Sequence, residues 1–247
     1  MCRQQIFAPA IRSAGVWWRD HVLAPRDRAS KTHGSSIGPA RNSVGRVRVV
    51  ARMTPDERRQ AIVDAALAVA RTKGLGGTTV RDVAAAMGTS SGLIHHYFGS
   101  MDDVLAAAFE QAAEGDLGRA RAAITAESDP ATQLDAFIQS YVPAQSDWTM
   151  QLWLDAWAEA ARRPTLQQVS RKLNREWQAI IRGIIDHGVA TGAFVSEDSD
   201  AAAWRLLSVL DGLALQVVAH DALITRDDVV AWTQHAAARE LTIGPAR

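Results

Sequence analysis

The sequence predicts an all-α protein in which an N-terminal helix-turn-helix domain precedes a larger helical domain. Three observations lead to this prediction. Apolar residues recur at helical spacing behind capping residues along most of the chain. Prolines and glycines separate these segments, as at Pro130, Pro143, Pro164 and Gly192. No alternation of apolar and polar residues indicates a β-strand.

Composition is typical of a soluble globular protein. The 247 residues suffice for one large domain or two small ones, and 47% are hydrophobic against 22% charged. The single cysteine, Cys2, cannot form an internal disulfide, which fits a reducing compartment. No apolar run approaches the length of a membrane span. We therefore expect a cytoplasmic protein with no membrane partner.

Residues 1–52 differ from the rest of the chain. They hold ten basic and two acidic residues, which leaves 17 basic and 25 acidic residues in 53–247. A basic arm that contacts phosphates is one interpretation, and an arginine-rich organellar presequence is another. We favour a disordered extension, or a mis-assigned start with Met53 as the true one. The expected domains are then 53–100 and 101–247.

The first helix is expected from Thr54 to about Lys73. Thr54 can cap it, Pro55 suits the first helical position, and Glu57 completes a capping box. Helical spacing predicts an inner face that is formed by Ile62, Ala65, Ala66 and Val69. Gly74 supplies the stop.

Two short helices follow, at about 79–87 and from Ser90 or Ser91 to Phe98. Thr79 and Asp82 cap the first, and Gly88 ends it. Two short helices joined by a tight glycine-bearing turn form a helix-turn-helix, whose second helix can enter a DNA major groove.

The second of these helices begins in the stretch TSSGLIHHYF, residues 89–98. Its small polar start allows close approach to DNA and offers backbone amides to phosphate. His95 and His96 point about a quarter-turn apart, so they do not share a metal ion easily, and we expect neither a metal site nor a cofactor. We expect both histidines to contact phosphate or bases, Tyr97 to reach phosphate, and Phe98 to anchor the helix in the core.

The segment from Thr79 to Leu105, TVRDVAAAMGTSSGLIHHYFGSMDDVL, resembles the DNA-binding signature of TetR-type transcriptional regulators. It departs from that pattern at Ser91, His95 and Met101, where phosphate-contacting lysines and a tyrosine are common. The resemblance and the residue chemistry together predict a set of DNA-contacting residues: Thr79, Arg81, Thr89, Ser90, Ser91, Gly92, Leu93, His95, His96 and Tyr97.

The remainder reads as six helices, expected at about 101–126, 131–142, 148–162, 165–191, 198–220 and 225–241. Residues 153–194 resemble the C-terminal domain of the BetI-like branch of the same family, through a Trp-rich helix, Trp177 and the sequence Gly192-Ala193-Phe194.

Six of the eight tryptophans lie beyond residue 147. Core packing explains each of them singly, whereas their clustering indicates a cavity for an apolar or quaternary-ammonium effector. The predicted lining is aromatic: Phe137, Tyr141, Trp148, Trp153, Trp157 and Trp177.

The last two helices predict a homodimer. A stripe of apolar residues can pack against a partner copy: Leu206, Leu210, Leu213 and Val217, joined by Trp232. A fully buried helix in a monomer is the alternative. By resemblance, a two-fold dimer would place its recognition helices about 34–36 Å apart on a palindromic operator in double-stranded DNA.

The predicted function is a dimeric repressor that a small molecule releases from its operator, with the helix at 101–126 linking the two domains. One alternative is an all-helical ligand-binding protein that has lost DNA binding. A second is an enzyme in which Asp155 and Glu159 act with His187 or His220, although no nucleophile motif supports catalysis.

Overall fold

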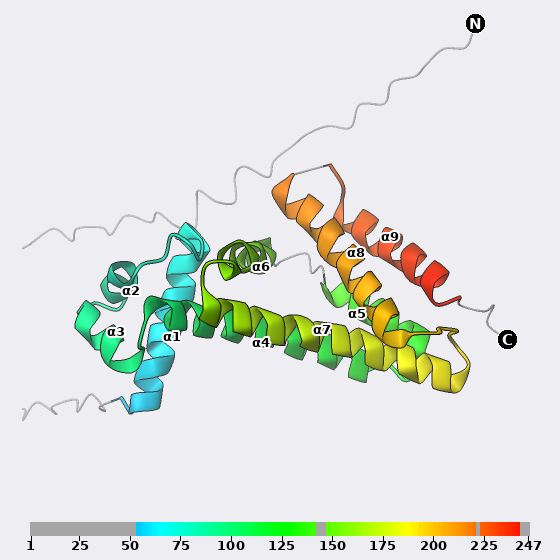
Figure 1. The fold of residues 1–247 in the computed structure, drawn as a ribbon, viewed down its shortest axis with the longest axis horizontal. Helices are drawn as coiled ribbons and strands as arrows, with labels where there is room; N and C mark the ends of the chain where they lie inside the picture. Colours follow the sequence, from blue (N-terminus) through cyan, green and yellow to red (C-terminus); the bar gives the residue numbers. More distant parts are fainter. Residues whose placement is uncertain (1–52, 142–146, 221–222, 243–247) are drawn as a thin grey trace, which may run out of the picture. The chain divides into compact units, whose positions relative to one another are not determined.

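The computed structural model describes residues 53–141, 147–220 and 223–242, and within them it is built from helices alone (Figure 1). The helices are α1 Pro55–Lys73, α2 Val80–Ala86, α3 Ser91–Tyr97, α4 Met101–Thr125, α5 Pro130–Tyr141, α6 Asp147–Ala160, α7 Pro164–Thr191, α8 Ser199–Ala219 and α9 Arg226–Glu240. The all-α prediction is confirmed. The predictions for residues 1–52 fall outside the described residues.

Side-chain caps form at the predicted starts of α1 and α2 but not at the start of α3. Thr54 and Glu57 form the expected capping box at α1, and Thr79 and Asp82 form the one at α2. At α3 the N-cap residue is Ser90, but its side chain makes no capping hydrogen bond. The start of α3 is therefore fixed by the preceding turn and by the packing of α3, rather than by a cap.

A small core holds the helix-turn-helix together. It is formed by α1, α2, α3 and the first two turns of α4, through Ile62, Val63, Ala66, Val83, Ala84, Ile94, Phe98, Val104 and Ala108. Phe98 is buried, as predicted. Because Val104 and Ala108 belong to this core, the N-terminal packing unit extends beyond the expected boundary at residue 100.

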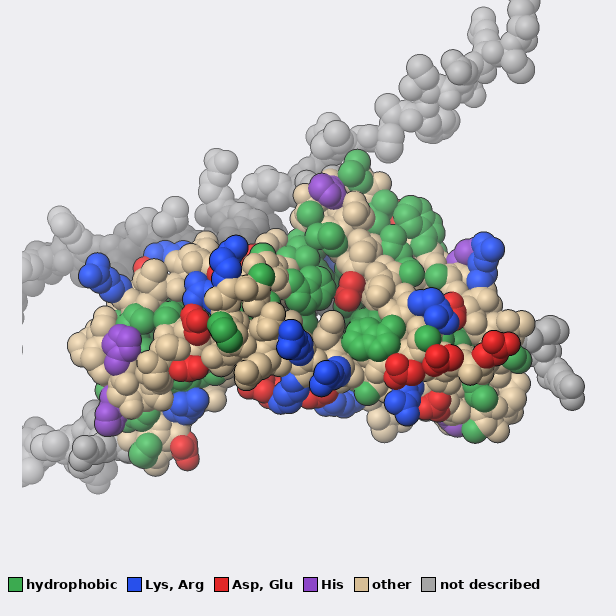
Figure 2. All heavy atoms as spheres, in the orientation of Figure 1, with side chains coloured by type: hydrophobic (Ala, Val, Ile, Leu, Met, Phe, Trp, Pro, Cys, Tyr) green, Lys and Arg blue, Asp and Glu red, His purple; other side chains and the backbone are tan. Residues whose placement is uncertain are grey.

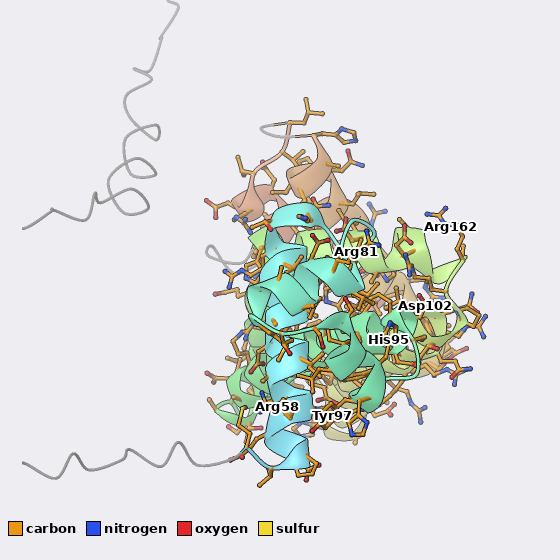
Figure 3. The ribbon with its side chains drawn as sticks, turned by 90° about the vertical axis from the view of Figure 1, so that its left-hand side faces the viewer. Arg58, Arg81, His95, Tyr97, Asp102 and Arg162 are labelled. Carbon is orange, nitrogen blue, oxygen red and sulfur yellow. The ribbon has the colours of Figure 1, made fainter. Side chains whose placement is uncertain are left out.

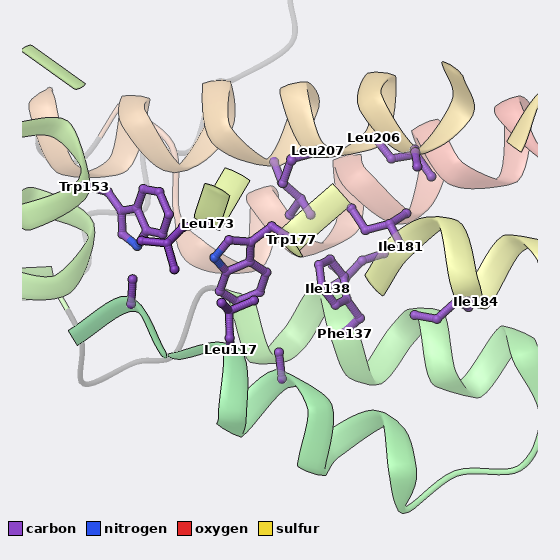
Figure 4. Packing of buried hydrophobic residues seen from close by; sticks show 14 of the residues in the cluster. Leu117, Phe137, Ile138, Trp153, Leu173, Trp177, Ile181, Ile184, Leu206 and Leu207 are labelled. Atoms are coloured by element: carbon purple, nitrogen blue, oxygen red, sulfur yellow. The ribbon is translucent and has the colours of Figure 1, made fainter. Parts of the chain in front are cut away.

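A second and larger core fills the space between α4, α5, α6, α7 and α8 (Figure 4). Phe109 and Leu117 of α4 point into it, together with Trp153, Trp177 and Ile181. Helix α4 therefore contributes to both cores, and this dual membership places it between the helix-turn-helix and the C-terminal helices.

Helix α8 is the one helix in the described ranges that is long and apolar enough to cross a membrane, with a mean hydropathy of 1.4. In the structure it packs on α7, α9 and α6. Its apolar character therefore serves at least in part to fill the second core.

Candidate DNA-binding surface and effector cavity

Helix α3 presents polar residues outward from the end of the molecule seen in Figure 3. Gly92, His95 and His96 are exposed, while Ile94 is buried as the anchor of the helix. Figure 2 shows histidine side chains at the surface over α3. The exposed positions of α3 thus match the residues expected to meet DNA, while the predicted contacts at Ser91, Leu93 and Tyr97 are half-buried.

Arg59 of α1 holds the C-terminal end of α3. Its Nη1 donates a hydrogen bond to the Tyr97 carbonyl oxygen at 2.9 Å, and its guanidinium lies 3.9 Å from the centre of the Phe98 ring. The Tyr97 ring also meets the His96 ring edge-on at 5.1 Å. Arg59 is itself exposed, and its contacts with Tyr97 and Phe98 help to fix the orientation of α3.

The start of α2 uses its polar groups internally. The Thr79 hydroxyl donates to Oδ2 of Asp82 at 2.6 Å, and Lys73 lies 2.5 Å from Oδ1 of the same carboxylate. These hydrogen bonds, from Lys73 first and then from Thr79, lower the pKa of Asp82 to about 2. Thr79 therefore positions α2, and Lys73 is already paired with an acidic residue.

Few cations remain on this surface for phosphate. Arg71 lies 4.5 Å over the ring of Trp148, away from α3. Arg59 and Lys73 are also engaged. Within residues 53–100, the cations without a hydrogen bond, ion pair or ring contact are Arg58 and Arg81, both labelled in Figure 3. Of the other two predicted contacts, Thr89 is half-buried between α2 and α3, and Ser90 is exposed.

The C-terminal core contains a cavity that is lined by residues from α4 to α9. Its lining consists of Asp116, Arg119, Ser140, Tyr141, Thr149, Met150, Trp153, Trp177, Ala214, Val217, Val218 and Arg226. About 40 Å³ is open to the centres of water molecules, which is room for roughly three waters. The cavity is therefore smaller than a choline-sized ligand.

Three of the six predicted ligand residues line this cavity. The rings of Tyr141 and Trp177 meet edge-on at 5.1 Å, and Trp153 stands edge-on to Phe109 at 4.8 Å. These rings offer both faces and edges to a ligand in an apolar space.

The other three predicted ligand residues lie around the cavity instead. Phe137 is fully buried behind it, 5.8 Å from Trp177. Trp157 packs on Trp153 at 5.8 Å. Trp148 borders an adjoining open groove of about 740 Å³ between α1, α4 and α6, which shares Asp116, Arg119 and Thr149 with the cavity. Packing of the helices, which residue spacing alone does not specify, decides this division.

Asp211 was missed by the sequence reasoning. It lies on α8 among apolar residues, and its Oδ1 accepts a hydrogen bond from the Tyr141 hydroxyl beside the cavity. A lone acidic residue within the predicted Leu206–Val217 stripe was the available signal, because a charge on an apolar helix face needs a partner.

The residues predicted to form the dimer interface are partly buried within the subunit and partly exposed at its surface. Leu206 and Leu210 are buried in the subunit's own core, and Val217 lines the cavity, so these residues are not open to a partner copy; Leu213 is half-buried. Trp232 is exposed as expected. The exposed large apolar residues of α8 are Trp204 and Leu215, because the inward stripe leaves the opposite face outward.

The residues considered for catalysis are separated. Asp155 and Glu159 face the loop between α1 and α2, whereas Nδ1 of His187 lies 3.2 Å from Gln133, and His220 is exposed. Among the described residues, no three His, Cys, Asp or Glu side chains gather into a group that could hold a metal ion.

Two family models match the chain. Residues 62–108 match the model of bacterial regulatory proteins of the tetR family, and residues 130–242 match the model of the C-terminal domain of BetI-type transcriptional repressors. The regulator BetI 1 of Chromohalobacter salexigens is 32% identical over 168 residues, which cover 66% of this chain and 80% of that protein. BetI of Paraburkholderia xenovorans is 29% identical over 163 residues, covering 64% and 80%.

Solved structures share the fold. A transcriptional regulator of Pseudomonas aeruginosa PAO1 matches with a TM-score of 0.68 at 24% identity, covering 76% of this chain and 92% of that one. A transcriptional regulator of Saccharomonospora viridis, crystallised in complex with choline, matches with a TM-score of 0.67 at 23% identity, covering 75% and 98%.

Proposed function

Since the chain belongs to the TetR family of bacterial transcriptional regulators, with a BetI-like C-terminal domain, we propose that it is a cytoplasmic dimeric repressor. A small cationic molecule releases it from a palindromic operator. One observation carries this proposal: the anchored helix α3 turns Gly92, His95 and His96 outward. The relatives named above are described as transcriptional regulators.

On DNA, α3 lies in the major groove with His95 and His96 at base edges or phosphates. Because Gly92 has no side chain, the backbone of α3 can come close to the DNA at this position. Arg81 and Arg58 contact phosphates on either side. Thr79 acts indirectly, because Asp82 already takes up its hydroxyl.

The scarcity of cations sets the dependence on salt. Two phosphate-contacting arginines per subunit give about four contacts for a dimer, and hence a slope of log K against log salt of about −3.6. Such a shallow slope means that specific base contacts must supply much of the affinity.

The effector site is the cavity of Tyr141, Trp153 and Trp177. Aromatic rings attract cations through their electron-rich faces, and the carboxylate of Asp211 lies behind Tyr141 as a counter-charge. The choline bound to the structural neighbour from S. viridis supports a ligand of this chemistry. Because the cavity holds roughly three waters, such a ligand must push its walls apart, and this selects a different conformer.

The partner copy packs on the exposed face of α8 and α9. Trp204 and Leu215 are eleven residues apart, so they share one face of α8, and Trp232 adds a ring that is 49% exposed. Figure 2 shows hydrophobic side chains gathered over α8. Burial of this surface by a second subunit would produce the two-fold symmetry that a palindromic operator requires.

The test combines operator selection with titration. The full chain is used to capture fragments of its host genome, and captured fragments are titrated by fluorescence anisotropy with and without choline. We expect sequence-dependent binding to a palindrome, loss of that binding in the His95→Ala/His96→Ala variant, and at least tenfold weaker binding when choline is added. Equal weak binding to captured and scrambled DNA would instead favour a ligand-binding protein without an operator.

A further inference from the structure

We propose that α6 carries the effector signal to the DNA-binding domain through Asp155, whose carboxylate holds the loop between α1 and α2. This inference rests on the proposed function, because it explains how the cavity and the DNA surface are coupled. Oδ2 of Asp155 accepts a hydrogen bond from the Leu75 backbone amide at 3.0 Å. Leu75 is fully buried, so this bond fixes a loop that has little freedom to reorient by itself.

The loop backbone lies unusually close to α6. A side chain at Gly74 would come within 2.8 Å of Oδ2 of Asp155, and one at Gly76 within 2.9 Å of Oε1 of Glu159. Gly74 also has a φ of 73°, which favours glycine. Asp155 thus holds the loop through one hydrogen bond, and Glu159, one helical turn later, leaves no room for a side chain at Gly76. A shift of α6 toward the loop would therefore displace it.

The same helix forms a wall of the effector cavity. Thr149, Met150 and Trp153 line that cavity, and Asp155 follows Trp153 by two residues. Both residues belong to one hydrogen-bonded helix, so a ligand that displaces Trp153 also displaces Asp155. A choline-sized ligand requires the cavity to expand. Helix α6 lines this cavity and also contacts the DNA-binding domain directly, at Leu75.

A chain of ion pairs ties the C-terminal end of α6 to α4. Arg163 lies 2.8 Å from Glu159 and 2.5 Å from Asp102, in the first turn of α4. The hydrogen bonds from Arg163 and then Arg162 lower the pKa of Glu159, which keeps it charged. The sequence predicted the helix at 101–126 as the link between the domains, and α6 provides a second connection at Leu75.

The experiment compares the full-length wild type with Asp155→Ala, with Asp155→Asn, which retains an acceptor oxygen, and with Glu197→Ala, an exposed carboxylate outside α6. Choline is the probe. Its binding is followed by tryptophan fluorescence, operator affinity by anisotropy, and exchange of the Leu75 amide by hydrogen–deuterium exchange. We expect choline to bind Asp155→Ala within threefold of wild type while losing at least tenfold of its effect on operator affinity. Leu75 should exchange at least tenfold faster in that variant, and Asp155→Asn should restore part of both properties.

Failure of the inference is distinct from failure of the proposed function. If choline releases wild type and Asp155→Ala from DNA by the same factor, the inference is overturned. If choline does not release wild type, the proposed effector is wrong, and Ala214→Phe then replaces the ligand by filling the cavity from α8. Ala214→Phe should change Leu75 exchange at least tenfold when Asp155 is present and less than twofold in the Asp155→Ala background. An unchanged rate with Asp155 present also overturns the inference.

Discussion

The hydroxyl of Tyr141 on α5 donates a hydrogen bond to Oδ1 of Asp211 on α8, beside the aromatic cavity. Burial raises the pKa of the Asp211 carboxyl to about 6, although the bond from Tyr141 lowers it. Burial and the nearby Asp211 also raise the pKa of Tyr141 well above its usual value. At neutral pH a carboxyl with this pKa is mostly ionised in a poorly hydrated place, which destabilises the fold.

Replacement of Asp211 by asparagine should stabilise the protein in a manner that depends on pH. The folded-state pKa of about 6 lies above the ordinary value of 3.8, so the folded state binds the proton more tightly, and wild-type stability from this group rises as the pH falls from about 7 to 4. We expect Asp211→Asn to raise the free energy of unfolding by up to about 3 kcal/mol at pH 7.5 and by little at pH 4. Urea denaturation at both pH values measures this, with Asp135→Asn on the exposed face of α5 as the control. A stabilisation of equal size at both pH values would contradict the assignment.

A substitution at Gly92 should weaken DNA binding without reducing the stability of the fold. A Cβ atom there would meet only the Ser90 hydroxyl at 3.7 Å, and one at Gly118 in α4 would meet nothing within 4 Å. Both glycines lie in helices, so Gly92→Ala and Gly118→Ala should each leave stability unchanged or raise it by up to about 1 kcal/mol. We expect only Gly92→Ala to weaken operator binding, by at least tenfold, because its methyl group would meet DNA. Thermal melting and anisotropy check the pair, and equal DNA affinity in the two variants would mean that α3 does not approach DNA at Gly92.

Arg58 and Arg59 are adjacent but should act differently. Arg59→Ala removes the hydrogen bond to the Tyr97 carbonyl and the stacking on Phe98, so we expect about 1–3 kcal/mol of lost stability and weaker DNA binding at every salt concentration. Arg58→Ala should change stability by less than about 0.5 kcal/mol. Its effect should appear in the salt dependence, where a dimer loses about two phosphate contacts and the slope becomes shallower by about 2. Denaturation and salt titration of both variants distinguish an arginine that holds α3 by intramolecular contacts from one that contacts phosphate.

The helices were predictable because their signals are local. A helix start is indicated within four residues by Thr54 with Glu57 and by Thr79 with Asp82. Both capping boxes are present in the structure. The three-dimensional division of the tryptophans was not predictable in the same way. Trp148 and Trp153 occur in one short helix, but only the packing of α6 against α1, α4 and α8 places Trp148 at the groove and Trp153 at the cavity.

Long-range hydrogen bonds were also beyond reach of the sequence. Asp155 and Leu75 are separated by eighty positions, and Asp155 with Glu159 resembles any solvated carboxylate pair on a helix. Helix α8 illustrates a related difficulty, because it is apolar on several sides. Leu206 and Leu210 looked as suitable for a partner copy as Trp204 and Leu215, and only the position of the subunit core decides which residues remain exposed.

The last prediction concerns that exposed face. Trp204 on α8 is 38% exposed, and Val189 on α7 is similarly exposed at 40%, so both tolerate a charge within the subunit itself. A glutamate at Trp204 would have to enter the apolar contact between two copies without a partner, at a cost of several kcal/mol. We expect Trp204→Glu to sediment as a monomer and Val189→Glu as a dimer. Since a monomer reaches one half-site, operator affinity should fall at least a hundredfold in Trp204→Glu alone. A dimeric Trp204→Glu variant would place the subunit contact on another face, and the inward burial of Leu206 and Leu210 would then leave Leu215 and Trp232 without a role in assembly.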